Sequence, residues 1–352
     1  MIRVGLVGFG MAGRVFHAPI ISSVDGLELA AVVERNSDYA AERYPGITTY
    51  RSLDELLTDS SIKLVVVATP NATHFNVALQ VLEAARNVVV DKPASTTSSE
   101  IAQLMGLAEG IGLKFIPFHN RRWDCDFRTI ERLLHEKELG RLAHFESNFD
   151  RWRPGSSTRA WKEEPEQGGL LLDIGTHLVD QALALFGPPG SIGAEVKRER
   201  DGEGANDSFT IRLHYYTGLT VTLGANLLSS FARPRFHLRG TRGNYWKWGL
   251  DPQEEALNKV TRIDATDWGR EPAENSGTIH TDSGQGLTTH PVESVPGDYR
   301  LFYQGVRDSL VSNANPPIAA IDAWRIAKIL EWAAESARLH HDIECDWSSE
   351  PV

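Results

Sequence analysis

A glycine-rich turn close to the start of the chain has the residue types and spacing to hold a phosphate group. The segment Gly8-Phe9-Gly10-Met11-Ala12-Gly13 directly follows an apolar run and opens a helical pattern. In such a turn the first glycine permits a tight bend, the second lets the backbone approach a pyrophosphate, and the third lets helix and strand pack closely. The helix start adds N–H groups and a partial positive charge. The motif therefore predicts a dinucleotide site that includes Gly8, Gly10, Met11, Ala12 and Gly13.

Two charged residues after the second predicted strand bear on which dinucleotide is bound. Glu34 lies twenty-one positions after Gly13, where an acidic residue can accept hydrogen bonds from the adenosine ribose. Arg35 follows directly and could pair with the 2′-phosphate of NADP, which Glu34 would repel. Both cofactors remain open. We favour NADP over NAD because Glu34 could rotate away from the phosphate.

The elements that must position this turn alternate between short apolar runs and helical patterns over residues 1–120. Two helix starts carry capping boxes, Ser52 with Glu55 and Thr97 with Glu100. Near-continuous apolar strands indicate burial on both faces, as in a parallel sheet covered by helices. Residues 1–120 are therefore predicted to form a doubly wound Rossmann domain. Its predicted strands are Ile2–Val7, Leu27–Val33, Leu64–Ala68, Asn87–Val90 and Phe115–Phe118.

The pattern changes in residues 121–352, which are predicted to form an α+β domain with a large, mostly antiparallel open sheet. Helices are expected over Asp126–Glu138, Asp173–Phe186, Asp298–Val311 and Ile321–His340. Strands are expected over Leu142–Asp150, Ser208–Tyr215, Leu219–Leu227, Arg235–Arg239 and Asn244–Trp248. Residues 258–296 show no clear period, and we assign them no element.

Composition excludes several classes of protein. The 352 residues are 41% hydrophobic and 24% charged, which is typical of a folded globular chain. The net charge of −11 gives no general attraction to nucleic acid or anionic lipid, and we expect neither as a partner. Cys125 and Cys345 are too sparse for a disulfide framework, which indicates a reducing cytoplasm. No cluster of residues has metal-ligand spacing, and we expect no metal.

Several motifs occur in a recognisable order along the chain. Phe16-His17-Ala18-Pro19, Ala68-Thr69-Pro70-Asn71 with His74, and Asp91-Lys92-Pro93 come first. His119-Asn120-Arg121-Arg122-Trp123-Asp124, Gly168-Gly169 and Leu172-Asp173-Ile174-Gly175-Thr176-His177 follow. With these motifs the chain resembles the glucose–fructose oxidoreductase / inositol dehydrogenase / rhizopine catabolism (Gfo/Idh/MocA) family, most closely the branch of NADP-dependent scyllo-inositol dehydrogenases. One departure is Asp91, where that family usually has Glu.

The resemblance implies an NAD(P)-dependent oxidoreductase that interconverts a secondary alcohol and a ketone, or a lactol and a lactone, on a cyclitol or sugar. It implies that His177 is the acid/base, that Asp173 binds a substrate hydroxyl or tunes His177, and that Lys92 holds the reacting oxygen and relays its proton. Asp173 and His177 lie four apart on a predicted helix and hence on one face. Asn71 and Lys92 follow strands at the carboxyl edge of the sheet, where ligands bind in such folds. The expected cofactor contacts on this side are Thr69, Pro70, Asn71, His74, Asp91 and Lys92.

Weaker candidates surround these residues. Arg151, Trp152 and Trp161 suit stacking on a sugar ring and bonding to its hydroxyls, although a lid or an oligomer contact would explain them too. The same substrate role is considered for Asn120, Arg122 and Trp123, with a hinge or salt-bridge role as the alternative. His17 is expected to pack near the cofactor.

Two other functions stay open. The fold could serve a non-catalytic dinucleotide-binding sensor, although retention of Lys92, Asp173 and His177 speaks against it. The same chemistry could also act on a diketide, an imine or a tetrapyrrole. The resemblance further implies a homodimer or homotetramer.

Overall fold

The computed structural model describes residues 1–155, 168–259, 263, 265–282, 284 and 286–351, and it divides into two compact units. The first unit consists of Met1–Trp123, Gln253–Trp268 and Asp298–Trp324. The second consists of Asp124–Pro252, Gly269–Gly297 and Arg325–Val352. The predicted boundary near residue 120 stays a prediction, and it did not include the two later segments that return to the first unit.

The first unit contains a parallel sheet, whose described strands run in the order β3-β2-β1-β4-β5-β6. This is the strand order of a Rossmann fold. The strands are β1 (Ile2–Val7), β2 (Leu27–Val33), β3 (Thr48–Tyr50), β4 (Leu64–Val67), β5 (Asn87–Asp91) and β6 (Phe115–Phe118). The helices are η1 (Gly13–His17, π-type), α1 (Ala18–Ser22), α2 (Tyr39–Arg43), α3 (Leu53–Thr58), η2 (Asn71–Thr73), α4 (His74–Glu83), α5 (Ser98–Gly110), η3 (Asn120–Trp123), α8 (Gln253–Asn258) and α9 (Arg300–Val311).

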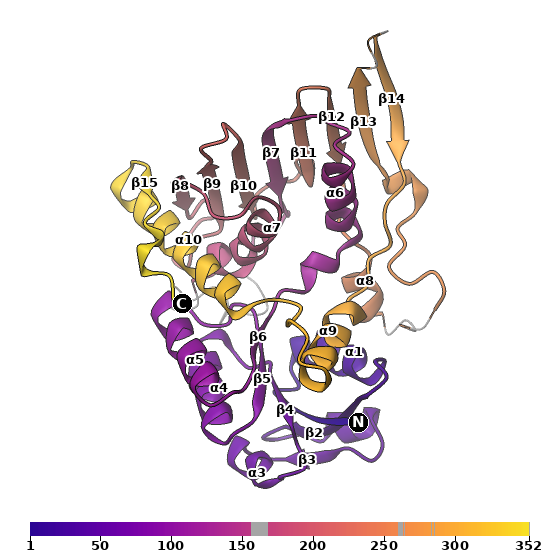
Figure 1. The fold of residues 1–352 in the computed structure, drawn as a ribbon, viewed down its shortest axis with the longest axis vertical. Helices are drawn as coiled ribbons and strands as arrows, with labels where there is room; N and C mark the ends of the chain where they lie inside the picture. Colours follow the sequence, from indigo (N-terminus) through magenta and orange to yellow (C-terminus); the bar gives the residue numbers. More distant parts are fainter. Residues whose placement is uncertain (156–167, 260–262, 264, 283, 285, 352) are drawn as a thin grey trace. The chain divides into compact units, whose positions relative to one another are not determined.

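Helices cover both faces of this sheet, as the apolar strands predicted. In Figure 1, α4 and α5 lie together on one side of the sheet, and α1 and α9 lie on the other. Every residue of β4 is buried. The predicted N-caps are present, because the hydroxyls of Ser52 and Thr97 accept from the backbone N–H groups of Glu55 and Glu100. Among the described strands of this sheet, only the three-residue edge strand β3 was not predicted, since so short a run shows no clear alternation of apolar and polar residues.

The second unit is built on a mixed sheet, for which the described strands run in the order β14-β13-β12-β11-β7-β10-β9-β8-β15. Only β7 and β10 pair in parallel among these strands, which agrees with the predicted, mostly antiparallel open sheet. The strands are β7 (Leu142–Asn148), β8 (Ser191–Lys197), β9 (Ser208–His214), β10 (Thr220–Asn226), β11 (Phe236–Gly240), β12 (Gly243–Lys247), β13 (Gly277–Asp282), β14 (Leu287–Val292) and β15 (Ile343–Glu344). The helices are α6 (Cys125–His135), η6 (Leu171–Gly175, π-type), α7 (Thr176–Phe186), η7 (Ala273–Asn275), α10 (Ala320–Leu339, mostly in this unit) and η8 (Trp347–Ser349).

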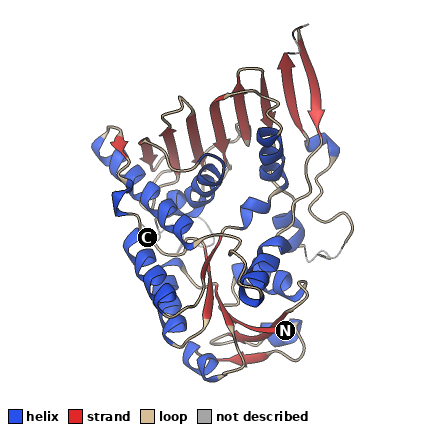
Figure 2. Ribbon diagram, in the orientation of Figure 1, coloured by secondary structure: helices blue, strands red, loops and turns tan. Residues whose placement is uncertain are grey.

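One face of this sheet carries the core of the second unit. Alternate residues of β9 are buried, and they pack in one cluster with apolar side chains of α6, α7 and α10. Figure 2 shows the row of strands with these helices against it. The alternation follows the two-residue period of a strand with one face toward a core. Two expectations need correction. The helix predicted from Asp173 begins with a π-type turn, and the unassigned residues 258–296 contain the hairpin β13–β14, which adds two strands beside β12.

Three further observations concern the described residues. None of their helices is both long and apolar enough to cross a bilayer. No group of three or more His, Cys, Asp or Glu side chains among them is arranged to hold a metal ion. Cys125 and Cys345 carry free thiols, and burial raises the pKa of the Cys345 thiol to about 12.

Candidate active site

The glycine turn has the backbone geometry that its sequence predicted. Gly8 has a φ of +100°, and a Cβ there would lie 2.6 Å from the carbonyl oxygen of Ala68. A Cβ on Gly13 would lie 2.2 Å from the carbonyl oxygen of Gly8. By contrast, a Cβ on Gly10 would meet nothing within 4 Å, so its backbone borders open space. The turn therefore fits a dinucleotide, because close packing surrounds the first and third glycines while the second is accessible to a phosphate.

The side chain of Glu34 makes its hydrogen bonds with its own chain. The side chain is buried, and its two carboxylate oxygens accept hydrogen bonds from the Ser37 hydroxyl and from the backbone N–H of Ala40, each at 2.8 Å. Ala40 lies in the first turn of α2, where N–H groups have no partner within the helix. Arg35, the next residue, is exposed. The local fold thus uses the carboxylate as a cap and leaves the arginine at the surface.

His74 joins the two turns that follow β4 and β5. Its ring is buried, with Nδ1 2.7 Å from the carbonyl oxygen of Pro93 and Nε2 2.7 Å from the carbonyl oxygen of Thr69. Because a carbonyl oxygen only accepts, the ring is the donor in a hydrogen bond to either oxygen. The Thr73 hydroxyl donates to the carbonyl oxygen of Pro70 at 2.7 Å, which closes the turn that carries Asn71. His74 therefore ties the predicted Asn71 and Lys92 segments together.

Asp91 holds the start of the turn that carries Lys92. Its Oδ1 accepts from the backbone N–H of Lys92 at 2.7 Å, and the Lys92–Pro93 peptide bond is cis. Its Oδ2 lies 3.7 Å from Nε2 of His17, a residue of the helix that follows the glycine turn. Burial raises the pKa of Asp91, but the contact and charge of His17, together with the charges of His74 and Lys92, outweigh burial and hold the pKa below its usual range. Asp91 is thus a carboxylate at neutral pH.

A tyrosine that sequence reasoning did not select completes this group. Nδ1 of His17 lies 2.7 Å from the hydroxyl of Tyr303 in α9, and both side chains are fully buried. Burial raises the pKa of Tyr303 well above its ordinary value, and the charge of Asp91 adds to the rise. The buried Tyr303 and His17 and the partly buried Asp91 therefore form a row that ends at the Lys92 backbone. No local signal marks Tyr303, which is 286 positions from His17.

In the second unit, Asp173 and His177 lie at the start of the predicted helix. Asp173 is in the π-type turn η6 and is partly buried, and His177 is buried in the first turn of α7. The Thr176 hydroxyl between them donates to the carbonyl oxygen of Leu172 at 2.6 Å. π-type turns are rare and recur at functional sites. The preceding Gly168 and Gly169 have φ values of +78° and +59°.

The weaker candidates fall in both units. Trp152 is 57% exposed, and the guanidinium carbon of Arg151 lies 4.7 Å from the Phe149 ring centre. In the first unit Arg122 forms an ion pair with Asp322, with Nη2 and Oδ2 2.9 Å apart. Asn120 is buried, and Trp123 packs edge-on against Phe302. Trp161 lies outside the described residues.

Comparison with known proteins gives concordant results over nearly the whole chain. An oxidoreductase family model with an NAD-binding Rossmann fold matches residues 2–119, and the GFO/IDH/MocA C-terminal domain model matches residues 127–246. The uncharacterized oxidoreductase YdgJ of Escherichia coli strain K12 is 38% identical, with 96% of each chain covered. The scyllo-inositol 2-dehydrogenase (NADP(+)) IolW of Bacillus subtilis strain 168 is 30% identical, over 96% of this chain and 94% of the relative. A crystal structure of an oxidoreductase from Bacillus cereus has a TM-score of 0.91 at 27% identity, covering 98% of this chain and 99% of that one.

Proposed function

Because this chain belongs to the GFO/IDH/MocA family of NAD(P)-binding oxidoreductases, we propose that it interconverts a secondary alcohol and a ketone on a cyclitol or sugar ring. The observation that carries the proposal lies in the first unit. Asp91 bonds to the Lys92 backbone and faces His17, which belongs to the helix that follows the glycine turn. The lysine turn thus contacts the helix that follows the glycine turn, which supports a shared site for cofactor and lysine. A sensor would have no need of a lysine turn held in this way.

Each residue has a defined role in the proposed reaction. A bound nicotinamide supplies hydride acceptance and donation. In the oxidation direction, we assign His177 to remove the proton of the substrate hydroxyl and Lys92 to hold the reacting oxygen. The carbinol hydrogen leaves as hydride to the nicotinamide as the C=O bond forms. Asp173 binds a neighbouring hydroxyl or orients His177. Histidine suits the proton transfer because its ordinary pKa allows exchange near neutral pH.

NADP is the proposed cofactor. A carboxylate that points at the adenosine ribose repels a 2′-phosphate, but the two oxygens of Glu34 each accept a hydrogen bond from its own chain, from Ser37 and Ala40. The exposed Arg35 then supplies the positive charge. Arg35→Ala is expected to raise the KM for NADP about tenfold or more, since a hydrogen bond to a charged group contributes roughly 1.5–3 kcal/mol. The KM for NAD should stay unchanged, and Arg43→Ala, which removes an exposed arginine from α2, is the control. An unchanged KM for NADP in Arg35→Ala would exclude this assignment.

The catalytic proposal is tested by following the absorbance of the reduced nicotinamide with inositols, aldoses and unrelated carbonyl compounds. Lys92→Ala and His177→Ala are each expected to lower kcat/KM by roughly 100-fold or more, with cofactor affinity retained. Lys63→Ala is the matched control, because Lys63 is exposed and precedes β4, at the amino ends of the strands. Near-normal turnover in either site variant would overturn the assigned roles. Cofactor binding without turnover of any compound would favour the sensor.

The remaining proposals concern the compartment and the oligomeric state of the enzyme. The two free thiols, Cys125 and Cys345, support a reducing compartment such as the cytoplasm. The family resemblance supports a homodimer or homotetramer, which light scattering of the purified chain measures directly.

A further inference from the structure

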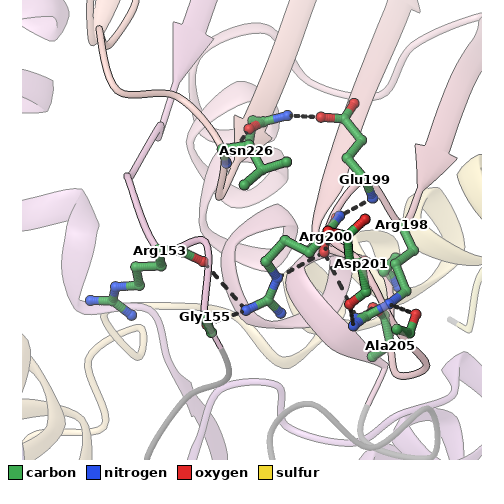
Figure 3. Close-up of polar contacts among 12 residues, drawn as sticks. Arg153, Gly155, Arg198, Glu199, Arg200, Asp201, Ala205 and Asn226 are labelled. Carbon is green, nitrogen blue, oxygen red and sulfur yellow. Dashed lines mark hydrogen bonds and ion pairs between the residues drawn. The ribbon is translucent and has the colours of Figure 1, made fainter.

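In the loop between β8 and β9, residues 198–207, one arginine side chain bonds to the backbone of the loop itself. Nε of Arg198 donates to the carbonyl oxygen of Gly202 at 2.8 Å, and its two terminal nitrogens donate to those of Asp201 and Ala205, each at 3.1 Å. Figure 3 shows this side chain against the backbone of its own loop. These hydrogen bonds hold the backbone of the loop, and they thereby help to set the positions of its last two residues, Asn206 and Asp207.

Asp207 uses this position to hold Arg200. The buried carboxylate accepts from the backbone N–H groups of Glu199 and Arg200, at 2.7 and 3.2 Å, and from Nε of Arg200 at 2.8 Å. Nη1 of Arg200 then donates to the carbonyl oxygen of Gly155 at 2.9 Å and to that of Arg153 at 3.4 Å, as Figure 3 shows. A buried ion pair is favourable only when its remaining donors are satisfied. Here the backbone that follows Arg151 and Trp152 supplies the acceptors for Nη1.

Asn206 holds a different part of the same unit. Its Oδ1 accepts from the N–H of Leu171 at 2.8 Å, its backbone oxygen accepts from the N–H of Leu170 at 2.9 Å, and its Nδ2 donates to the carbonyl oxygen of Gly168 at 3.0 Å. Helix starts leave N–H groups without intrahelical partners, and a residue from another loop supplies the acceptors here. A Cβ on Gly169 would lie 2.5 Å from the carbonyl oxygen of Asn206, which explains the glycine at that position.

The neighbours Asn206 and Asp207 thus anchor both flanks of residues 156–167. One flank carries Arg151 and Trp152, and the other leads into the turn of Asp173 and the helix of His177. Because both anchors lie in one loop, that loop links the positions of the two flanks. A polyhydroxylated ring must be held from more than one side while its reacting carbon is aligned. A misplacement of about 1 Å can cost roughly 100-fold in rate.

We propose that Asn206 and Arg200 are positioning residues, which set the distance between the substrate segment Arg151–Arg153 and the start of the His177 helix. This inference rests on the proposed function for its kinetic consequences. Asn206 acts on the orientation of Asp173 and His177, and Arg200, held by Asp207, acts on the substrate segment. Neither residue touches cofactor in this assignment, so cofactor affinity is independent of both.

The test combines three variants with one matched control. Asn206→Ala should lower kcat about tenfold, and Arg200→Met should raise the KM for the polyol about tenfold, each with the Kd for cofactor unchanged. Asn206→Asp, which keeps the acceptor for the Leu171 N–H, should recover part of the kcat. Asn87→Ala is the control, since the half-buried Asn87 amide also joins a backbone oxygen, that of Lys63, to a backbone N–H, that of Lys114.

Amide hydrogen exchange supplies a readout that needs no substrate. In Arg200→Met, exchange should quicken at Arg151 and Arg153, and also at Leu170 and Leu171, because one loop serves both flanks. Quicker exchange at only one flank would overturn the inference that one loop anchors both flanks. Losses of stability in Asn206→Ala and Asn87→Ala with unchanged kcat and KM would overturn the positioning role. If Lys92→Ala were fully active, the proposed function would fail, whereas the exchange result would still decide for or against the anchor.

Discussion

Replacing Asp91 by asparagine isolates the charge of the carboxylate that holds the Lys92 turn. The amide has nearly the same shape and keeps an oxygen that can accept from the Lys92 N–H, now 2.7 Å from Oδ1. It removes the negative charge that faces His17 at 3.7 Å and lies close to His74 and Lys92. Asp91→Asn therefore tests electrostatics with little change in packing.

The expected magnitude follows from the contacts. A hydrogen bond to a charged group contributes about 1.5–3 kcal/mol, against about 1 kcal/mol for a neutral one, so the loss at the Lys92 N–H is roughly 1 kcal/mol. The loss of the contact with buried His17, 3.7 Å away, adds to this. We expect Asp91→Asn to lower the free energy of unfolding by about 1–3 kcal/mol at pH 7. A displaced Lys92 should lower kcat/KM about tenfold, which corresponds to about 1.4 kcal/mol.

The stability difference between the natural chain and Asp91→Asn should depend on pH in a definite direction. The pKa of Asp91 is lowered on folding, so its contribution to stability is complete above the unfolded pKa of about 3.9. That contribution is lost as the pH falls through the lower, folded pKa. The stability difference between the natural chain and Asp91→Asn should therefore be constant from neutral pH down to about pH 5 and shrink below about pH 4.

Urea unfolding followed by tryptophan fluorescence at pH 7 and at acid pH measures this difference. Asp267→Asn is the control, since Asp267 is an exposed carboxylate of the same unit. Equal stability of Asp91→Asn and the natural chain at pH 7, together with unchanged kcat/KM, would refute the reasoning about this carboxylate. A stability difference that grows with acid would refute the assigned direction of its pKa.

Three further predictions concern other contacts. Tyr303→Phe leaves Nδ1 of buried His17 without its 2.7 Å partner and should cost about 1–3 kcal/mol of unfolding free energy, measured by urea denaturation. Lys247→Met leaves Glu271, now 2.7 Å from the Lys247 amine, as a buried unpaired charge. It should cost about 3–5 kcal/mol, seen as a lower Tm in calorimetry. Gly13→Ala places a methyl group 2.2 Å from the carbonyl oxygen of the first glycine and should abolish dinucleotide binding in fluorescence titration, and normal binding would exclude the assigned turn.

Much of the Rossmann unit was predictable because its signals are local. The strands β1, β2 and β6 have the predicted bounds, and the hydroxyl caps at Ser52 and Thr97 are present. Each depends on side chains within a few positions of one another. The π-type turn at Asp173 was not predictable, since the apolar spacing there is also compatible with a regular helix.

The hairpin β13–β14 shows a different limit of prediction from sequence. Its residues are rich in Thr and Gly, and the exposed β14 has little alternation of buried and exposed positions. Pairing with β12 supplies the backbone partners that make these residues strands. A weak local pattern became regular structure only beside an existing sheet edge.

The amino-acid sequence by itself determined the glycine turn, the buried strands around it, and the presence of Lys92, Asp173 and His177. Only the tertiary structure decided that Glu34 faces α2, that Tyr303 supports His17, and that Asn206 caps the helix start 35 residues away. The physical reason is the separation along the sequence of the residues that interact. Turns, caps and strands follow from the conformations of adjacent residues, whereas the partner of a buried polar group is set by whichever distant segment the fold brings within about 3 Å.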